Sequence, residues 1–355
     1  MSNVTVLGID LAKNIFQLHG VDKNGKKVSS KAVRRNKLLS EVVKLKPCLI
    51  GMEACGGAHY WARCFKDLGF EVKLMSPQFV KPYVKGNKND ANDAAACAEA
   101  VTRPTMNFVP IKTVEQQDIQ LLHRVRSRLV SQRTALTNQI RGLLAEYGIV
   151  VNKGIASLRR RLPEILEEEQ NELTEFGKEI FQELYDELCS LTKRIDKYEE
   201  KVKVLSKYDE RCRILETIPG IGKLTSTAFV AAVGNAEVFA KGRQLSAWLG
   251  LVPKQHSSGG KTRLLGISKR GDRYLRSLFI HGGRSVAKTA QKKKDRYSLR
   301  VQALIERCGM NKTVVAIANK NVRIAWALLK NNTAFDPNYK VEKPITGVND
   351  ARKAA

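Results

Sequence analysis

Two pairs of acidic residues in the first hundred positions have the types and spacing that phosphodiester chemistry requires. Asp90 and Asp93 stand three apart in "NDANDAAACAEA", an alanine-rich run that predicts a helix with both side chains on one face. Asp10 ends "VTVLGID" and Glu53 ends "CLIGME", two apolar runs that predict strands. Several carboxylates together can hold Mg²⁺ ions while leaving coordination positions open for phosphate. These four acids are therefore a candidate metal-binding and catalytic set.

The "NDAND" run taken alone has a simpler interpretation. Asn or Asp often caps the start of a helix, and acids in the first turn are favoured by the positive end of the helix dipole. The placement of Asp10 and Glu53 at the ends of apolar runs favours a shared site instead, because strand ends and a helix start can deliver all four carboxylates to one place.

The elements that must position these acids alternate between strands and helices. Residues 4–33 predict a three-strand meander, with an Asn-Gly turn signal before its third strand. A helix in "SEVVKLKP", a strand in "CLIGMEA", a helix in "AHYWARCFKDLG" and a strand in "FEVKLMSP" follow. This β-β-β-α-β-α-β order resembles the ribonuclease H-like fold in its RuvC-like form, in which such acids hold divalent metal ions. We expect residues 1–112 to form this α/β catalytic domain, with a boundary near the start of the next helix.

The middle of the chain, residues 113–210, predicts two long helices. Apolar residues recur at helical spacing over 113–147 and over 164–207, and the two helices are expected to pack as an antiparallel coiled coil or to form a dimerisation arm. The first helix carries a face of arginines that could follow a phosphate backbone or simply be solvated. These are Arg124, Arg126, Arg128, Arg133 and Arg141.

The third segment, residues 211–335, predicts a mainly helical domain rich in positive charge. Between Lys241 and Lys330 there are 21 Lys and Arg residues and only three acids. "IPGIG" lies between two helical patterns and resembles a helix-hairpin-helix turn, in which backbone N–H groups of Gly220 and Gly222, with Lys223, contact phosphate. A tight turn with a purely structural role is the alternative. Residues 336–355 are expected to be a flexible tail.

A polar, glycine-rich stretch, "QHSSGGKTR", lies inside this basic segment. Gly259 and Gly260 would let the backbone approach a phosphate, and adjacent cations would neutralise it. A flexible basic loop is the alternative. The residues predicted to contact nucleic acid in and around this stretch are Lys254, Lys261, Arg263, Lys269, Arg270 and Arg273.

The overall composition points to a polyanionic partner. A formal charge of +27 and a pI near 9.9 make a compact fold repel itself unless nucleic acid shares its surface. The sequence shows neither an apolar run that could span a bilayer nor the layout of a secretion signal. We therefore expect no membrane partner and a cytoplasmic protein. The nucleoid-associated location, in a bacterium or archaeon, is what the family resemblance described next implies.

Several motifs together resemble the IS110 family of insertion-sequence transposases. Asp10, Glu53, Asp90 and Asp93 match the family's Asp-Glu-Asp-Asp motif in order and spacing, and "GIDLAK", "MEACGGAHYWA", "IPGIG" and "GLVP…SSGG…ISKRG" match its conserved blocks. The glycine after "IPGI" and the wording of the C-terminal block are more similar to the IS1111 subgroup. The resemblance covers nearly the whole chain.

The resemblance implies a DNA recombinase that excises and inserts its element, guided by a structured bridge RNA, with Mg²⁺ or Mn²⁺ as cofactor. It implies that the serine of the Ser-Gly step acts as nucleophile with the acid cluster. Here that position is Ser258, although Ser257 stands beside it. The expected partners are donor and target DNA, the guide RNA and further copies of the chain in a homodimer or homotetramer.

Two other functions remain open from the sequence. One is a Holliday-junction resolvase-like, metal-dependent nuclease that uses only the four acids, and the other is a non-catalytic nucleic-acid scaffold. A resolvase activates water and has no use for a serine nucleophile, so the Ser-Gly step separates the first alternative from a recombinase. Metal-dependent DNA cleavage separates both enzymes from the scaffold.

Overall fold

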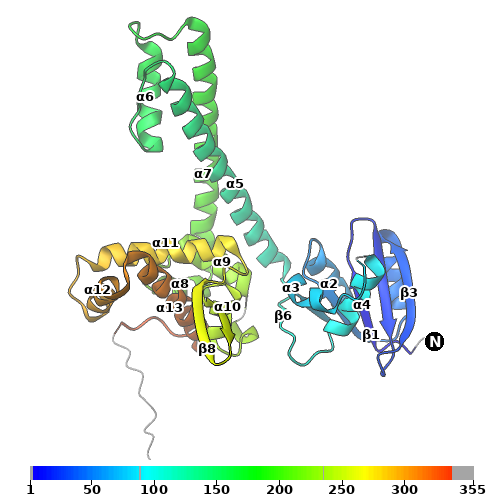
Figure 1. Ribbon diagram of the computed structural model, residues 1–355. Helices are drawn as coiled ribbons and strands as arrows, with labels where there is room; N and C mark the ends of the chain where they lie inside the picture. The colour runs from blue at the N-terminus through cyan, green and yellow to red at the C-terminus, as the bar shows by residue number, and fades with distance from the viewer. Residues whose placement is uncertain (1–2, 88, 235, 338–355) are drawn as a thin grey trace, which may run out of the picture. The chain divides into compact units, whose positions relative to one another are not determined.

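The computed structural model describes residues 3–87, 89–234 and 236–337. The chain divides into two compact units, Met1–Gln117 and Asp118–Ala355, whose elements are labelled in Figure 1. The boundaries predicted at residues 112, 210 and 335 stay predictions, and the predicted tail lies outside the described residues from 338 onward. Across the described stretches, no helix is both long and apolar enough to cross a membrane.

The first unit is built on a mixed sheet with the strand order β3-β2-β1-β4-β5-β6. Its strands are β1 (Val6–Asp10), β2 (Ile15–Val21), β3 (Lys27–Arg34), β4 (Leu49–Glu53), β5 (Glu71–Met75) and β6 (Phe108–Val109). The first three form an antiparallel meander, while β4 and β5 run parallel to β1. All five predicted strands are confirmed. The strand β6 was not predicted, because a strand of two residues is too short to show the alternation of side chains that indicates a strand.

Helices cover both faces of this sheet. They are α1 (Leu38–Val43), α2 (Ala58–Asp67), the short α3 (Pro77–Val80) and α4 (Asp90–Ala100). Alternation along the strands divides the core: Leu7 and Ile9 pack with α1 and α2 around Trp61, whereas Val6 packs with α4 around Cys97. The sheet is therefore buried on both faces, as a parallel β1-β4-β5 core requires.

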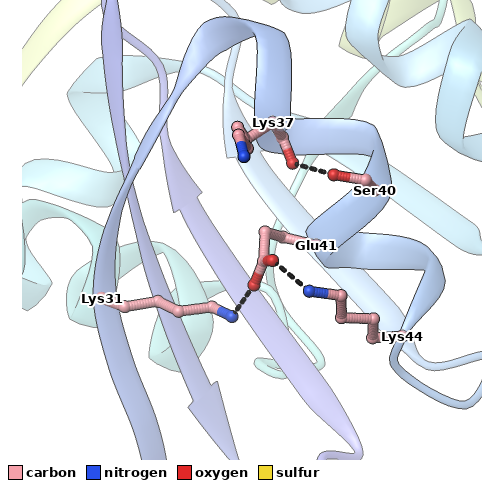
Figure 2. A network of polar contacts seen from close by, with 5 residues as sticks. All are labelled: Lys31, Lys37, Ser40, Glu41 and Lys44. Carbon is pink, nitrogen blue, oxygen red and sulfur yellow. Dashed lines mark hydrogen bonds and ion pairs between the residues drawn. The ribbon is translucent and has the colours of Figure 1, made fainter.

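A surface ion cluster ties α1 to the edge strand β3. Figure 2 shows the Glu41 carboxylate between Lys31 of β3 and Lys44 just beyond α1, with Lys44 Nζ 2.5 Å from Glu41 Oε1. Hydrogen bonds from Lys31 and then Lys44 lower the pKa of Glu41 to about 2. The lysines also leave charge on an exposed edge strand, which discourages pairing with another chain.

The second unit begins with an arm of three helices. They are α5 (Val114–Ala145), whose first residues belong to the first unit, α6 (Ile155–Glu167) and α7 (Glu175–Tyr208). α5 and α7 run antiparallel and share an apolar cluster with α6 that includes Leu136, Leu158 and Leu188 (Figure 1). The antiparallel pair was predicted from the sequence, and a coiled-coil supercoil stays a prediction.

The second long helix does not start where the sequence indicated. The predicted pattern over 164–207 is broken, because α6 ends at Glu167 and α7 begins only at Glu175. The Asn171 side chain accepts a hydrogen bond from Leu173 N at 3.0 Å, and the Thr174 hydroxyl caps α7 by accepting from Gly177 N at 3.2 Å. These local side-chain bonds stabilise a turn within a sequence whose apolar spacing looked continuous.

The sequence predicts that the arginines of α5 share one exposed face. In the structure they do not. Arg126 forms an ion pair with Glu199 of α7, its Nη2 lying 2.5 Å from Glu199 Oε1. Arg141 donates to the carbonyls of Asn152 and Gly154 at 2.7 Å and so holds the loop before α6. The residues of this set left exposed are Arg124 and Arg128, while Arg133 is half-buried. Arg126 and Arg141 therefore stabilise the arm.

A helical body follows the arm. It contains α8 (Glu210–Glu216), α9 (Lys223–Val233), α10 (Gly242–Trp248), α11 (Arg273–Ala290), α12 (Arg296–Cys308) and α13 (Met310–Asn331). Its core includes Phe229 and Phe279, whose rings meet edge to face at 5.6 Å. A two-stranded hairpin, β7 (Pro253–Ser258) and β8 (Lys261–Ile267), connects α10 to α11. The expectation of a mainly helical segment is confirmed.

A buried histidine joins the arm to this body. His123 of α5 is 3 % exposed, with Nε2 3.0 Å from the Thr227 hydroxyl of α9 and Nδ1 3.1 Å from the Tyr274 hydroxyl of α11. Burial, with a smaller contribution from Arg126, lowers the pKa of His123 from 6.5 to about 4. The imidazole is therefore neutral at neutral pH and packs as part of the core.

Candidate active site

Asp10 and Glu53 lie at the same end of two neighbouring parallel strands. β1 and β4 pair in the register Gly8↔Gly51 and Ile9↔Met52, so the two carboxylate residues follow one step later on each strand. Alternation places them on the same face as Gly8 and Gly51, which is the face that α4 covers. Both are half-buried.

Two glycines bring α4 down onto the strands that carry these acids. A Cβ at Gly8 would lie 2.1 Å from the Ala94 carbonyl oxygen, and one at Gly51 would lie 2.7 Å from Val101 Cβ. No other residue type fits at this approach without moving the helix. The repeated pattern Gly-x-Asp and Gly-x-Glu is thus the sequence signal for this site, and only its acids entered the prediction.

The start of α4 delivers the second pair of acids. The cap is Asn89, whose side-chain oxygen accepts a hydrogen bond from Asn92 N at 2.8 Å. Asp90 and Asp93 are therefore not needed as caps, although both lie in the first turn, where the helix dipole favours them. Asp93 is half-buried, and Asp90 is exposed.

The Cys97 thiol of α4 is affected by the charges of three of the acids. Burial raises the pKa of this thiol, and the charges of Glu53, Asp10 and Asp93 raise it further. Glu53 and Asp10 likewise raise the pKa of Cys55, after the effect of burial. The structure thus brings Asp10, Glu53 and Asp93 within electrostatic reach of a single buried side chain on α4. Cys97 was not singled out in the sequence.

The side chains as placed do not by themselves enclose a metal ion. Among the residues that the structure describes, no three His, Cys, Asp or Glu side chains are grouped closely enough to hold one. The donor chemistry nevertheless fits a hard divalent cation, because every member of the set supplies carboxylate oxygens.

Ser258 ends the first strand of the exposed hairpin. The stretch predicted to be a glycine-rich loop is a paired hairpin, with Ser258 opposite Lys261 and His256 opposite Arg263, and Gly259 and Gly260 form the turn with φ of +55° and +76°. Positive φ at both turn positions suits a tight hairpin and explains the Gly-Gly pair.

Strand alternation separates the two serines. Cross-strand partners share a face, so Ser258 lies with His256, Lys261 and Arg263, whereas Ser257 lies with Thr262 on the opposite face. The Ser257 hydroxyl also accepts a hydrogen bond from Gln255 Nε2 at 2.8 Å. Ser258 is therefore the serine that lies on the basic face.

The base of the hairpin is held far more firmly than its tip. A Cβ at Gly250 would lie 2.2 Å from the Arg270 carbonyl oxygen, and one at Gly271 would lie 1.9 Å from the Trp248 carbonyl oxygen. Arg276 of α11 donates to the Leu249 and Arg270 carbonyls at 3.1 and 3.0 Å. The residues before β7 and after β8 therefore pack tightly against the helical body. Of the thirteen strand residues, all but Ile267 are exposed.

The remaining predicted phosphate contacts fall into two groups. The first group is exposed: Gly222, Lys223, Lys254, Lys261, Arg263, Lys269, Arg270 and Arg273. Gly220 differs, because its φ of +88° and its packing against Gly282 of α11, where a Cβ would lie 2.7 Å from the carbonyl oxygen, give it a structural reason to be glycine. For Gly220 the tight-turn alternative accounts for these contacts, and a phosphate contact there stays a prediction.

Comparison with known proteins identifies the family. A sequence profile described as Transposase IS116/IS110/IS902 family matches residues 212–298, and a second, described as a transposase of the IS110 DEDD type, matches residues 7–149. The transposase for insertion sequence element IS1111A of Coxiella burnetii is 49 % identical over 335 residues, which cover 94 % of this chain and 92 % of the relative. The chain belongs to the IS110 transposase family.

Other relatives of this IS110 transposase match over similar lengths. A probable family 20 transposase of Pseudomonas aeruginosa is 47 % identical and covers 94 % of this chain and 99 % of its own length. The IS1328 transposase of Yersinia enterocolitica is 40 % identical over the same shares. The predicted family is confirmed, and the IS1111 subgroup fits the relatives found.

Membership of the family fixes the broad activity of this IS110 transposase. It is an enzyme of insertion-sequence transposition that cuts and rejoins DNA, so DNA is its substrate. The DEDD type implies a ribonuclease H-like fold for the first unit, in agreement with its mixed sheet, and a general dependence on divalent metal ions.

Proposed function

We propose that this transposase excises and inserts its element with two sets of catalytic residues, the carboxylates Asp10, Glu53, Asp90 and Asp93 and the Ser258 hydroxyl. The observation that carries the proposal is the placement of Asp10 and Glu53 at the same end of β1 and β4, on the face of the sheet that α4 covers, with Asp93 in the first turn of that helix. Carboxylates in such number at strand ends repel one another, and a fold keeps that arrangement when a cation uses it.

The carboxylates would hold Mg²⁺ or Mn²⁺. A bound ion of this kind would supply positive charge to a scissile phosphate. Asp10 and Glu53 are fixed by the β1-β4 ladder, and Asp93 is fixed by the packing of α4 on Gly8 and Gly51. The strand order, together with a helix lying on the acid-bearing face, supports a RuvC-like form of the ribonuclease H-like fold for this unit.

Ser258 would act as the nucleophile. Its Oγ loses a proton and bonds to phosphorus, the bond from phosphorus to one sugar oxygen breaks, and that oxygen takes up a proton. In the second step a hydroxyl end of another strand attacks the phosphoserine and restores the Ser258 hydroxyl. The neighbours Lys261 and Arg263 share its face of the hairpin and would attract the phosphate.

Sequence choice would come from a guide RNA. The exposed Lys and Arg residues of the helical body suit phosphate contacts, which position a nucleic acid without reading its bases. A bridge RNA that pairs with the DNA would then select the sites, and two or four copies of the chain would handle the two duplexes. RNA transcribed from the DNA beside the gene should bind the protein and be required for recombination.

The test of the acid assignment is a recombination assay on plasmid-borne element ends with Mg²⁺ and the flanking transcript. Asp10→Asn and Asp93→Asn should each lower the rate by about 100-fold or more, while DNA binding in EDTA stays unchanged. Asp67→Asn, at an exposed position of α2, is the matched control and should recombine normally. Normal recombination by Asp10→Asn would contradict the assignment. DNA cutting that survives Ser258→Ala would support the resolvase-like nuclease instead.

A further inference from the structure

A shallow aromatic groove lies at the end of the sheet in the first unit. Its volume is about 640 Å³, within the range of ligand sites, and it is lined by the start of β2, the end of β3 and the first turn of α2. The groove is lined by Asn14, Ile15, Arg34, Arg35, Asn36, Tyr60 and Trp61.

The groove lies beside the end of β1 that carries Asp10. Asp10 pairs with Gln17 on β2, and the groove residue Ile15 is two residues further along that strand, or about 7 Å. Ile15 in turn pairs with Arg34 of β3. By strand alternation, Asp10, Ile15 and Arg34 belong to the face of the sheet that α4 covers, whereas Trp61 of α2 packs on the opposite face. The groove therefore lies around the end of the sheet that carries Asp10.

The floor of the groove is rigid. Trp61 is 5 % exposed, and its ring meets that of Phe16 edge to face at 5.3 Å. The Arg35 guanidinium lies 5.2 Å from the Trp61 ring centre, and Arg35 N donates to the Asn14 carbonyl at 2.8 Å. Arg35 is thus fixed over an aromatic base before any ligand arrives.

One wall of the groove is an exposed aromatic ring. Tyr60 is 48 % exposed, its ring lies 5.1 Å from that of Trp61, and Ile15 opposite is 53 % exposed. The neighbouring Cys64 side chain, one turn along α2, raises the pKa of Tyr60. The wall therefore presents a flat apolar surface to solvent.

The chemistry of the lining selects the ligand. Two arginines supply positive charge, two asparagines supply donors and acceptors, and no acidic side chain lines the groove. A nucleobase has a flat face for an aromatic ring and a polar edge for amides, and its phosphate needs a cation. Bases offer their faces only when they are unstacked, so duplex DNA would not fill the groove.

We propose that this groove binds an unstacked nucleotide of single-stranded DNA, with the base on Tyr60 and its phosphate at Arg34. DNA is favoured over RNA because the groove shares a sheet end with Asp10, and this argument rests on the proposed catalytic role of that residue. The nucleotide would hold the strand unpaired next to the bond to be cut.

The experiment measures binding of a fluorescent single-stranded DNA 12-mer to the full chain in EDTA, where no cutting occurs. Tyr60→Ala should weaken binding about 10-fold, the loss of one base-aromatic stack, and Tyr60→Phe should retain it. Arg34→Gln should also weaken binding. Tyr208→Ala, which removes a tyrosine 77 % exposed on α7, is the matched control and should bind normally. Circular dichroism verifies that each variant is folded.

Two results would overturn the proposal. One is unchanged binding of the DNA 12-mer by Tyr60→Ala, and the other is weakened binding only for an RNA 12-mer of the same sequence, which would assign the groove to RNA. Photocrosslinking of 5-iodouracil in the DNA 12-mer to residue 60 is the positive outcome. Because binding is measured without catalysis, this test can fail while the Asp10→Asn recombination test succeeds, and the reverse.

Discussion

The acid cluster and the serine hairpin are built in opposite ways. The acids lie on strand ends whose register is fixed by the core, beneath a helix that two glycines bring into contact with the sheet. Ser258 lies at the exposed tip of a two-stranded hairpin that is fastened only at its base. The strand ends that carry the carboxylates are thus held in place by packing, whereas Ser258 is exposed to solvent at the hairpin tip.

This difference predicts where substitutions act on folding and where they act on chemistry. Substitutions of Gly8 or Gly51, beneath the acids, should unfold the first unit, because α4 packs directly on these two glycines. A change of the Ser258 side chain at the hairpin tip should leave stability untouched, since this residue is exposed.

The largest stability effect is expected at Gly8. Gly8→Ala places a methyl 2.1 Å from the Ala94 carbonyl oxygen and should lower the free energy of unfolding by about 3 kcal/mol or more. The same change at Gly142, an open position on α5, should be neutral or stabilise by about 0.5–1 kcal/mol. Urea denaturation of both variants measures the contrast. Equal stabilities would mean that α4 does not pack on the strands as described.

An intermediate effect should appear as acid sensitivity of the body that carries the hairpin. His123 has a pKa of about 4 when folded and 6.5 when unfolded, so between these values only the unfolded chain takes up the proton. Stability should be complete above pH 6.5 and fall by about 3 kcal/mol as pH drops to 4. Denaturation at several pH values measures this, with His123→Gln as the control that loses this component. The same slope in His123→Gln would assign the effect to other groups.

The smallest effect should be a gain of stability at the acid cluster without metal. Neutralising one of several neighbouring carboxylates relieves repulsion, so Asp93→Asn should stabilise the protein in EDTA by a few tenths of a kcal/mol, up to about 1. Thermal melting with and without Mg²⁺ measures it, and the wild type should gain more from Mg²⁺ than the variant does. A lower melting temperature for Asp93→Asn in EDTA would indicate that Asp93 has a structural role instead.

Much of the first unit could be predicted from the sequence, because the spacing of apolar residues and the positions of turn-forming residues indicated the same elements there. Apolar runs ending in an acid gave β1 and β4, and the Asn24-Gly25 signal gave the turn between β2 and β3, where Gly25 has a φ of +76°. The approach of α4 to the sheet could not be derived, since it depends on Gly8 and Gly51 becoming neighbours through strand pairing. Single-sequence patterns carry no such distant contacts.

In the second unit, the sequence predicted the helices but not the contacts that end them or pair their charges. Helical spacing predicted α5 and most of α7, yet the break at 168–174 depends on side-chain bonds of Asn171 and Thr174 that apolar spacing does not report. Arg126 and Arg141 looked like a phosphate-binding face until their partners on α7 and in the following loop were known. Charge is visible in a sequence, whereas whether a charge is already paired depends on the fold.

The central claim is that Ser258 forms a bond to DNA only when the acid cluster is intact. The direct measurement traps the reaction on a nicked suicide substrate, denatures the protein, digests it with trypsin and searches by mass spectrometry for DNA-linked peptide 255–261. We predict the adduct on Ser258 in wild type and in Ser257→Ala, and its loss in Ser258→Ala and in Asp10→Asn. An adduct in Ser258→Ala, or undiminished adduct in Asp10→Asn, would contradict the account.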